Sequence, residues 1–72
     1  MKPNSHQAWY NRGNALVYLG QNEEAIASFE KALVLKPNKD QAWNNRGIAL
    51  SELGRHEAAI NSYDQSSSMQ AS

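Results

Sequence analysis

The chain has 72 residues, no cysteine, a formal net charge of zero at pH 7 and 40% hydrophobic residues. A chain of this length has room for one small domain, and its zero net charge provides no field that would attract nucleic acid or an anionic membrane. The absence of cysteine excludes disulfides and thiolate metal sites. Together with the lack of a leader segment or of an apolar run of about 20 residues, this absence favours a soluble cytoplasmic protein.

An internal repeat with a period of 34 residues organises the chain. The segment from Trp9 to Leu16 returns as the segment from Trp43 to Leu50, and about 16 of the 34 aligned positions are identical. The recurring positions hold apolar anchors, small residues and turn residues, which the stacking of helix pairs constrains. We therefore expect a single domain over residues 1–72, with repeats at about 3–36 and 37–70.

The first repeat begins with a predicted helix over about residues 5–19. Asn4 is its expected N-cap, and Gly20 is the expected left-handed residue that ends it. Gly13 lies inside this helix, where glycine costs about 1 kcal/mol relative to alanine, so its recurrence predicts a close crossing with another helix. The apolar face of this helix has helical spacing. Its members are Ala8, Trp9, Gly13, Leu16 and Leu19.

A second helix is predicted to begin at Asn22 as its cap and to stop before Pro37. Glutamates in its first turn and lysines towards its end complement the helix dipole. Its apolar stripe is wide enough to pack on two neighbours. The stripe consists of Ala25, Ile26, Phe29, Ala32 and Leu33.

The second repeat has the same plan. Asn38 is the expected cap of the third helix, Gly54 ends it, and the fourth helix begins near His56. The apolar face of the third helix continues through Trp43, Gly47, Leu50 and Leu53, and that of the fourth through Ala59, Ile60 and Tyr63. Serines at 66–68 then replace the apolar residues of the first repeat. These serines are consistent with a natural polar cap and equally with a truncated end.

These residues resemble the tetratricopeptide repeat pattern over essentially the whole chain. The match is carried by Trp9, Gly13, Leu16, Ala25, Phe29 and Pro37, and again by Trp43, Gly47, Leu50, Ala59 and Tyr63. The departures are Arg12 and Arg46 in place of leucine, Leu16 and Leu50 in place of tyrosine, and Ala71 in place of proline. The resemblance implies an all-α fold of two stacked antiparallel helix-turn-helix repeats, an α-solenoid with a right-handed superhelix. It also implies a scaffold that holds peptides in a concave groove lined by the first helix of each repeat.

The implied groove is lined mainly by amide, hydroxyl and aromatic side chains. Asn11 and Asn45 occupy matching positions, and each amide group can pair with the N–H and C=O of an extended peptide. The pair resembles two rungs of the asparagine ladder in O-linked N-acetylglucosamine transferases. The alternative is that both are solvated helix asparagines. The candidate peptide-binding residues are Asn11, Asn45, Asn14, Tyr10, Asn44, Gln7 and Gln41.

The two recurring arginines are expected to lay their methylene stems along the edge of the core. Their guanidinium groups would then remain in water as contacts for a partner. The family's clamp for a C-terminal carboxylate matches only at Asn14 and Asn45. Tyr10 stands where that clamp has lysine, so carboxylate capture is not predicted.

No catalytic, cofactor or metal site is predicted, and the chain is not expected to be an enzyme. His6 and His56 have no second ligand at helical spacing, so zinc binding is not expected. Asp64 and the serines at 66–68 lack a base and an oxyanion donor, and they are expected on the surface. The tryptophans are expected in the core rather than on a platform for nucleic-acid bases, because the chain has no basic patch.

Two functional hypotheses remain. The first is a protein–protein interaction scaffold whose partner is an extended peptide or protein segment. The alternative is a self-assembling structural repeat unit, because two repeats are fewer than the three that usually bury a continuous core. Weak homo-oligomerisation is then expected through the ends of the stack, either head to tail between the fourth helix and the first helix of another copy, or across a twofold axis between fourth helices. The candidate residues for self-association are Ile60, Tyr63 and Met69.

Overall fold

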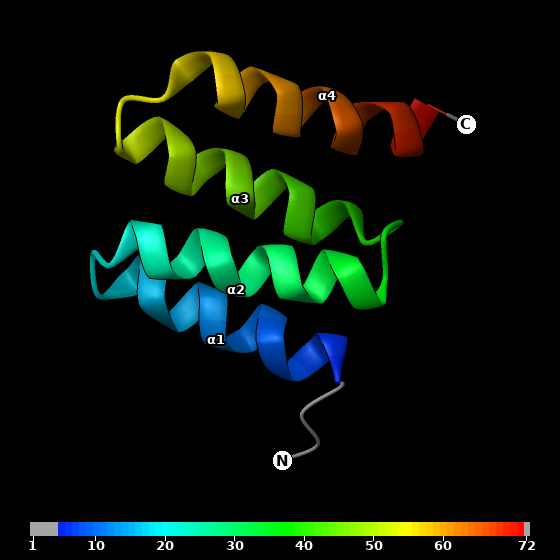
Figure 1. Cartoon of the computed structure of the whole chain (residues 1–72). Helices are drawn as coiled ribbons and strands as arrows, with labels where there is room; N and C mark the ends of the chain where they lie inside the picture. Colours follow the sequence, from blue (N-terminus) through cyan, green and yellow to red (C-terminus); the bar gives the residue numbers. More distant parts are fainter. Residues whose placement is uncertain (1–4, 72) are drawn as a thin grey trace.

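The computed structural model describes residues 5–71, with the side chains of residues 5–66, and this part of the chain is entirely helical apart from its loops. The four helices are α1 (His6–Tyr18), α2 (Asn22–Leu35), α3 (Asp40–Glu52) and α4 (His56–Ala71). They stack in chain order as antiparallel neighbours joined by short loops (Figure 1). The predicted all-α fold of two stacked helix pairs is confirmed.

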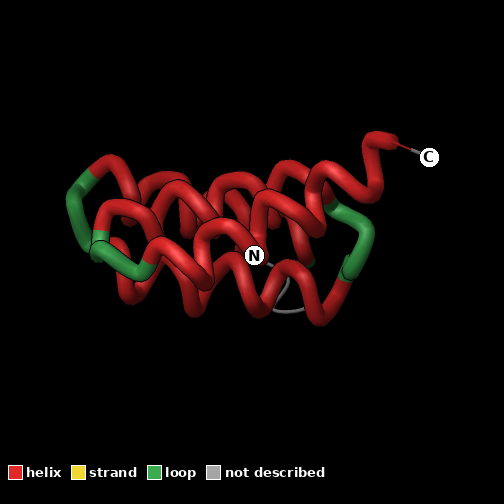
Figure 2. The backbone as a smooth tube through the Cα atoms, turned by 90° about the horizontal axis from the view of Figure 1, so that it is seen from above, coloured by secondary structure: helices red, strands yellow, loops and turns green. Residues whose placement is uncertain are grey.

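The molecule is a thin slab. Its principal extents are 32 × 30 × 14 Å, and the view from above shows that all four helices run nearly along one direction (Figure 2). The helices α1 and α2 pack together, as do α3 and α4, and α2 packs on α3. The contact between α1 and α3 is marginal, so these two first helices leave an open face between them.

The left-handed glycines end the first helix of each repeat as predicted. Gly20 and Gly54 have φ angles of +79° and +80°. The amide of the residue after each glycine returns to the helix, from Gln21 to the carbonyl of Leu16 over 2.8 Å, and from Arg55 to that of Leu50 over 2.9 Å. Glycine is favoured here because a side chain at positive φ clashes with its own backbone.

The predicted N-caps differ from those observed. Asn4 lies outside the described residues, and the cap of α1 is Ser5, whose hydroxyl accepts from the amide of Ala8 over 3.4 Å. The predictions for Asn22 and Asn38 are wrong. Asn22 is the first residue inside α2, whose cap position falls on Gln21. Asn38 lies in a tight turn, and α3 begins after Lys39. The N-cap position therefore falls on Lys39, one residue after Asn38.

The hydrophobic core lies mainly between α2 and α3. Its central member is Phe29, which is fully buried, and Tyr10 packs against this ring with a centroid separation of 6.0 Å. Both tryptophans are only half-buried, so their predicted place inside the core is wrong. Leu19 and Leu53 are exposed, because each comes directly after the end of its helix and leaves the apolar face. The core cluster consists of Ala25, Ile26, Phe29, Ala49, Leu50 and Ala59.

The helical glycines mark close crossings, as predicted. A Cβ atom on Gly13 would lie 2.5 Å from the ring of Phe29, and one on Gly47 would lie 2.7 Å from the ring of Tyr63. Both distances are far below van der Waals contact. Within each repeat, an aromatic ring of the second helix therefore sits directly on the backbone of the first.

Candidate protein-interaction surface

The open face between α1 and α3 contains a shallow hollow of about 170 Å³. Its base combines aliphatic side chains with two amide groups. Tyr18 stands at its rim with 95% of its surface exposed, and Ile48 is 40% exposed. Apolar groups that lie side by side on one exposed face can mark an interaction site. The lining residues are Asn14, Val17, Tyr18, Asn45 and Ile48.

Asn45 bridges the two repeats at the edge of this hollow. Its Nδ2 donates to the Tyr10 hydroxyl over 3.0 Å and to Asn14 Oδ1 over 2.7 Å. Both amide hydrogens of Asn45 are therefore used within the protein, and they fix the spacing of α1 and α3. Asn11 and Asn45 therefore differ in their surroundings, because Asn45 bonds α1 of the preceding repeat, whereas no described helix precedes α1.

Asn11 belongs to an exposed polar row along α1. Gln7 donates from Nε2 to Asn11 Oδ1 over 3.3 Å and accepts at Oε1 from Lys39 over 3.2 Å. Lys39 also lies 4.6 Å from the centre of the Tyr10 ring. The lysine thus ties the loop before α3 to α1, so the candidate residues Gln7, Tyr10 and Asn11 form one group.

The other candidates lie along α3. Asn44 is exposed and its Nδ2 stands 3.5 Å from Asn45 Oδ1, at the limit of a hydrogen bond. Gln41 is exposed one turn earlier on the same helix. The structure thus brings Asn44, Asn45 and Asn14 to one side of the hollow. Gln41 is not among the residues that line the hollow.

The two arginines bond within the protein, and they differ in exposure: the Arg12 side chain is 49% exposed, as expected, whereas that of Arg46 is 21% exposed. Arg12 donates to the buried hydroxyl of Ser28 and lies 4.0 Å from Glu24. Arg46 donates to the buried hydroxyl of Ser62 over 2.6 Å. The two serines take part in the packing and were missed from sequence, although each recurs with its arginine at a constant separation of 16 residues.

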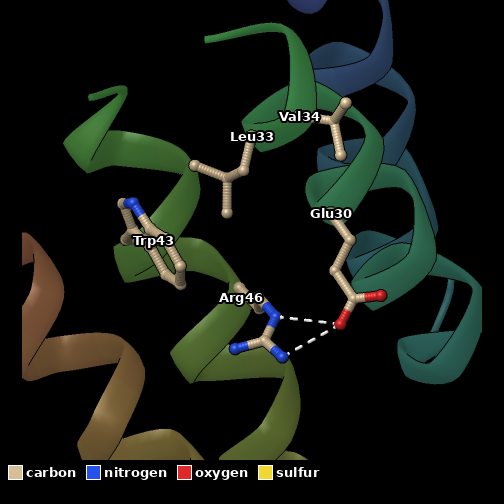
Figure 3. A pocket seen from close by; sticks show the side chains of 5 residues that line it. All are labelled: Glu30, Leu33, Val34, Trp43 and Arg46. Atoms are coloured by element: carbon tan, nitrogen blue, oxygen red, sulfur yellow. Dashed lines mark hydrogen bonds and ion pairs between the residues drawn. The ribbon is translucent and has the colours of Figure 1, made fainter. Parts of the chain in front are cut away.

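Arg46 also lines a second hollow, between α2 and α3, of about 250 Å³ (Figure 3). The Trp43 ring and the Leu33 side chain face its interior, and Val34 and Glu30 close the α2 side (Figure 3). Glu30 Oε2 accepts from two nitrogens of Arg46, over 2.9 and 3.2 Å. The ion pair therefore links the second helix of one repeat to the first helix of the next.

The remaining residues considered from the sequence are the histidines and the serines at 66–68. Burial, followed by the charges of Lys39 and Lys36, lowers the pKa of His6 below its ordinary value of 6.5. Among the described residues, no three histidines, cysteines or carboxylates lie close enough together to hold a metal ion. Ser66 is buried, which contradicts its expected surface position, because a small side chain fits where Ala32 lies in the first repeat.

The candidates for self-association differ in where they lie on α4, because Ile60 is on the side that no described helix covers, whereas the Tyr63 ring packs against Gly47 of α3. Ile60 is 56% exposed and Tyr63 is 37% exposed. Met69 falls outside the described side chains.

Within residues 5–71, no helix has the length and apolar character that crossing a membrane requires.

Antiparallel helix pairs that recur every 34 residues and leave an open face along their first helices define an α-helical repeat protein. A family model described as TPR repeat matches residues 13–54, and one described as tetratricopeptide repeat matches residues 40–72. The chain belongs to the tetratricopeptide repeat family, whose repeats generally mediate protein–protein interactions. No curated protein matches the chain.

Solved structures of MamA share the fold. A point mutant of MamA is 31% identical, with a TM-score of 0.91 and a match that covers 93% of this chain and 49% of that one. A structure described as MamA MSR-1 C2 is 28% identical, with a TM-score of 0.93 and coverage of 97% and 40%. A crystal structure of MamA, 22% identical with a TM-score of 0.91, covers 94% and 40% and shows likeness of fold alone. The chain thus spans about half of these proteins or less.

Proposed function

We propose that the face formed by α1 and α3 binds an extended peptide segment of a partner protein. The observation that carries the proposal is the hollow between the two helices, in which exposed Tyr18 and Ile48 stand beside the amides of Asn14 and Asn45. Peptide grooves combine these two elements, since pockets receive alternate side chains and polar groups bind the main chain. Family membership supports a protein partner.

The expected ligand has little charge and carries a small apolar side chain. The hollow is lined by no charged residue, and its volume of about 170 Å³ suits a side chain of the size of valine or leucine. The bridge between the repeats joins Asn45 to Tyr10 and Asn14 and does not involve the exposed amides of the other candidates. These amides can therefore pair with the peptide main chain; they belong to Asn11, Asn44 and Gln41.

The test is a titration with a peptide selected from a random displayed library against the parent protein. Replacing Tyr18 and Ile48 together with alanine should weaken binding about tenfold, because roughly 50 Å² of apolar contact is lost. The matched control is Lys31→Ala, at an exposed site on α2. The proposal fails if the double variant binds like the parent while Lys31→Ala weakens binding.

Self-assembly is a second candidate function, supported by a different observation. The outer side of α4 carries an exposed isoleucine and carboxylates at the positions that α3 covers on α2. A helix face that matches a covered one is suited to receive another repeat. Sedimentation across protein concentration tests this candidate, and a parent that remains monomeric would exclude it.

A further inference from the structure

The outer side of α4 repeats the apolar chemistry of the α2 side on which α3 packs. Ile60 corresponds to Ile26 one repeat period earlier. Ile26 is 7% exposed and belongs to the core with Ala49 and Leu50 of α3, whereas Ile60 is 56% exposed. The two isoleucines differ in exposure because α3 covers α2, whereas no described helix covers α4.

The carboxylates of α2 recur in the same way. Glu30 accepts from Arg46 over 2.9 Å, and Glu23 accepts from Arg55 over 2.9 Å. Their counterparts one period later are Asp64 and Glu57, both exposed on α4. Neither counterpart forms an ion pair with a side chain in residues 5–66. The α4 side therefore keeps the acidic partners that α2 uses to hold the next repeat.

The opposite end of the molecule presents the complementary set. Arg12, Ala15 and Leu16 of α1 are the counterparts of Arg46, Ala49 and Leu50 of α3. Ala15 is exposed and Leu16 is half-buried, while both counterparts in α3 are buried. Among the described residues, the one carboxylate that pairs with Arg12 is Glu24 of the same repeat, at 4.0 Å and on the exposed surface.

We propose that the α4 face, made of Glu57, Ile60 and Asp64, docks the α1 face, made of Arg12, Ala15 and Leu16, of a second copy of this chain. This inference rests on the second candidate function, self-assembly, and specifies its register. The copies stack head to tail, as α3 packs on α2. Arg12 of the second copy then meets Asp64, and Ile60 is covered by Ala15 and Leu16 of the second copy.

The occupant is a second copy because the two ends of this chain are complementary in charge and apolar shape, with the α2–α3 interface as their template. The contact between copies is weaker than the α2–α3 interface. Gln21 stands where the second repeat has Arg55, so one ion pair is missing opposite Glu57. Serines occupy positions 67 and 68, where α2 has Leu33 and Val34. The head-to-tail contact leaves both ends open, so association continues beyond the dimer.

The experiment is sedimentation equilibrium of the parent and three surface variants. Asp64→Lys replaces attraction to Arg12 by repulsion and should weaken association at least about fivefold. Gln21→Arg restores the missing ion pair and should tighten association about threefold. Adding Glu57→Gln to Gln21→Arg should remove that gain. Circular dichroism melts check that each variant folds like the parent, which is the expected result because all three positions are exposed.

The possible results separate the register from self-assembly itself. A rising average mass without a dimer plateau, with the three variants ordered as stated, supports the proposal. A parent that associates but does not respond to Asp64→Lys and Gln21→Arg overturns the head-to-tail register and leaves self-assembly standing. A plateau at the dimer also overturns it, because a twofold contact closes on itself. A parent monomeric up to about 1 mM overturns both.

Discussion

Arg46 donates a hydrogen bond from Nη1 to the buried hydroxyl of Ser62 over 2.6 Å, and Arg12 makes the same bond to Ser28 in the first repeat. The arginines replace the leucine of the family pattern. A guanidinium at the edge of the core requires an acceptor, and the serine hydroxyl of the second helix supplies one. The arginine and the serine therefore form a coupled pair that recurs in both repeats.

This coupling predicts a non-additive mutant cycle. Arg46→Leu alone leaves the buried Ser62 hydroxyl without its donor and should lower the free energy of unfolding by about 1–3 kcal/mol. Adding Ser62→Ala should recover at least half of that loss. Urea denaturation measures both effects. Arg55→Leu, which removes only an exposed ion pair, is the control and should change stability by less than about 1 kcal/mol. Additive effects in the cycle would show that the pair is not coupled.

The helical glycines should respond differently to alanine. Gly13→Ala should lower the free energy of unfolding by about 1–3 kcal/mol, although alanine ordinarily favours a helix, because fully buried Phe29 cannot move away. Gly47→Ala should cost less, since the Tyr63 ring is partly exposed and can turn outward. Thermal melts compare the two. Equal destabilisation would mean that ring mobility does not decide the outcome.

The two matched asparagines should differ in their effect on stability. Asn45→Ala removes both bonds of the inter-repeat bridge and should lower the free energy of unfolding by about 1–2 kcal/mol. Asn11→Ala changes an exposed residue with one weak contact and should alter it by less than about 0.5 kcal/mol. Chemical denaturation measures both. An Asn11 effect as large as that of Asn45 would contradict this account of the bridge.

Acidification should destabilise the fold through His6. Burial and the nearby lysines lower the pKa of His6 in the folded state, so the unfolded chain binds the proton more readily. The contribution of His6 to stability is therefore present above the ordinary value of 6.5 and is lost as the pH falls below it. His6→Gln should flatten the dependence of the melting midpoint on pH between about pH 7.5 and 5.5, above the carboxylate range. An NMR titration that gives His6 a pKa above 6.5 would refute this.

The sequence by itself determined the repeat period, the four helices, the left-handed turns and the glycine crossings. These features depend on residues close in the chain or on spacing within one helix, so Gly20 and Gly13 identify them directly. The sequence did not determine the exact N-cap residues. A helix start that shifts by one residue moves the cap from Asn22 to Gln21 or from Asn38 to Lys39.

Only the tertiary structure decided how equivalent positions differ between the repeats. Ile26 is buried and Ile60 is exposed, and Asn45 is bonded across the repeats while Asn11 faces solvent. Local pattern cannot distinguish these pairs, because the two residues of each pair occupy the same position of the 34-residue repeat. Burial and bonding depend on whether another helix lies against that side, and this is a property of the position of a repeat within the stack.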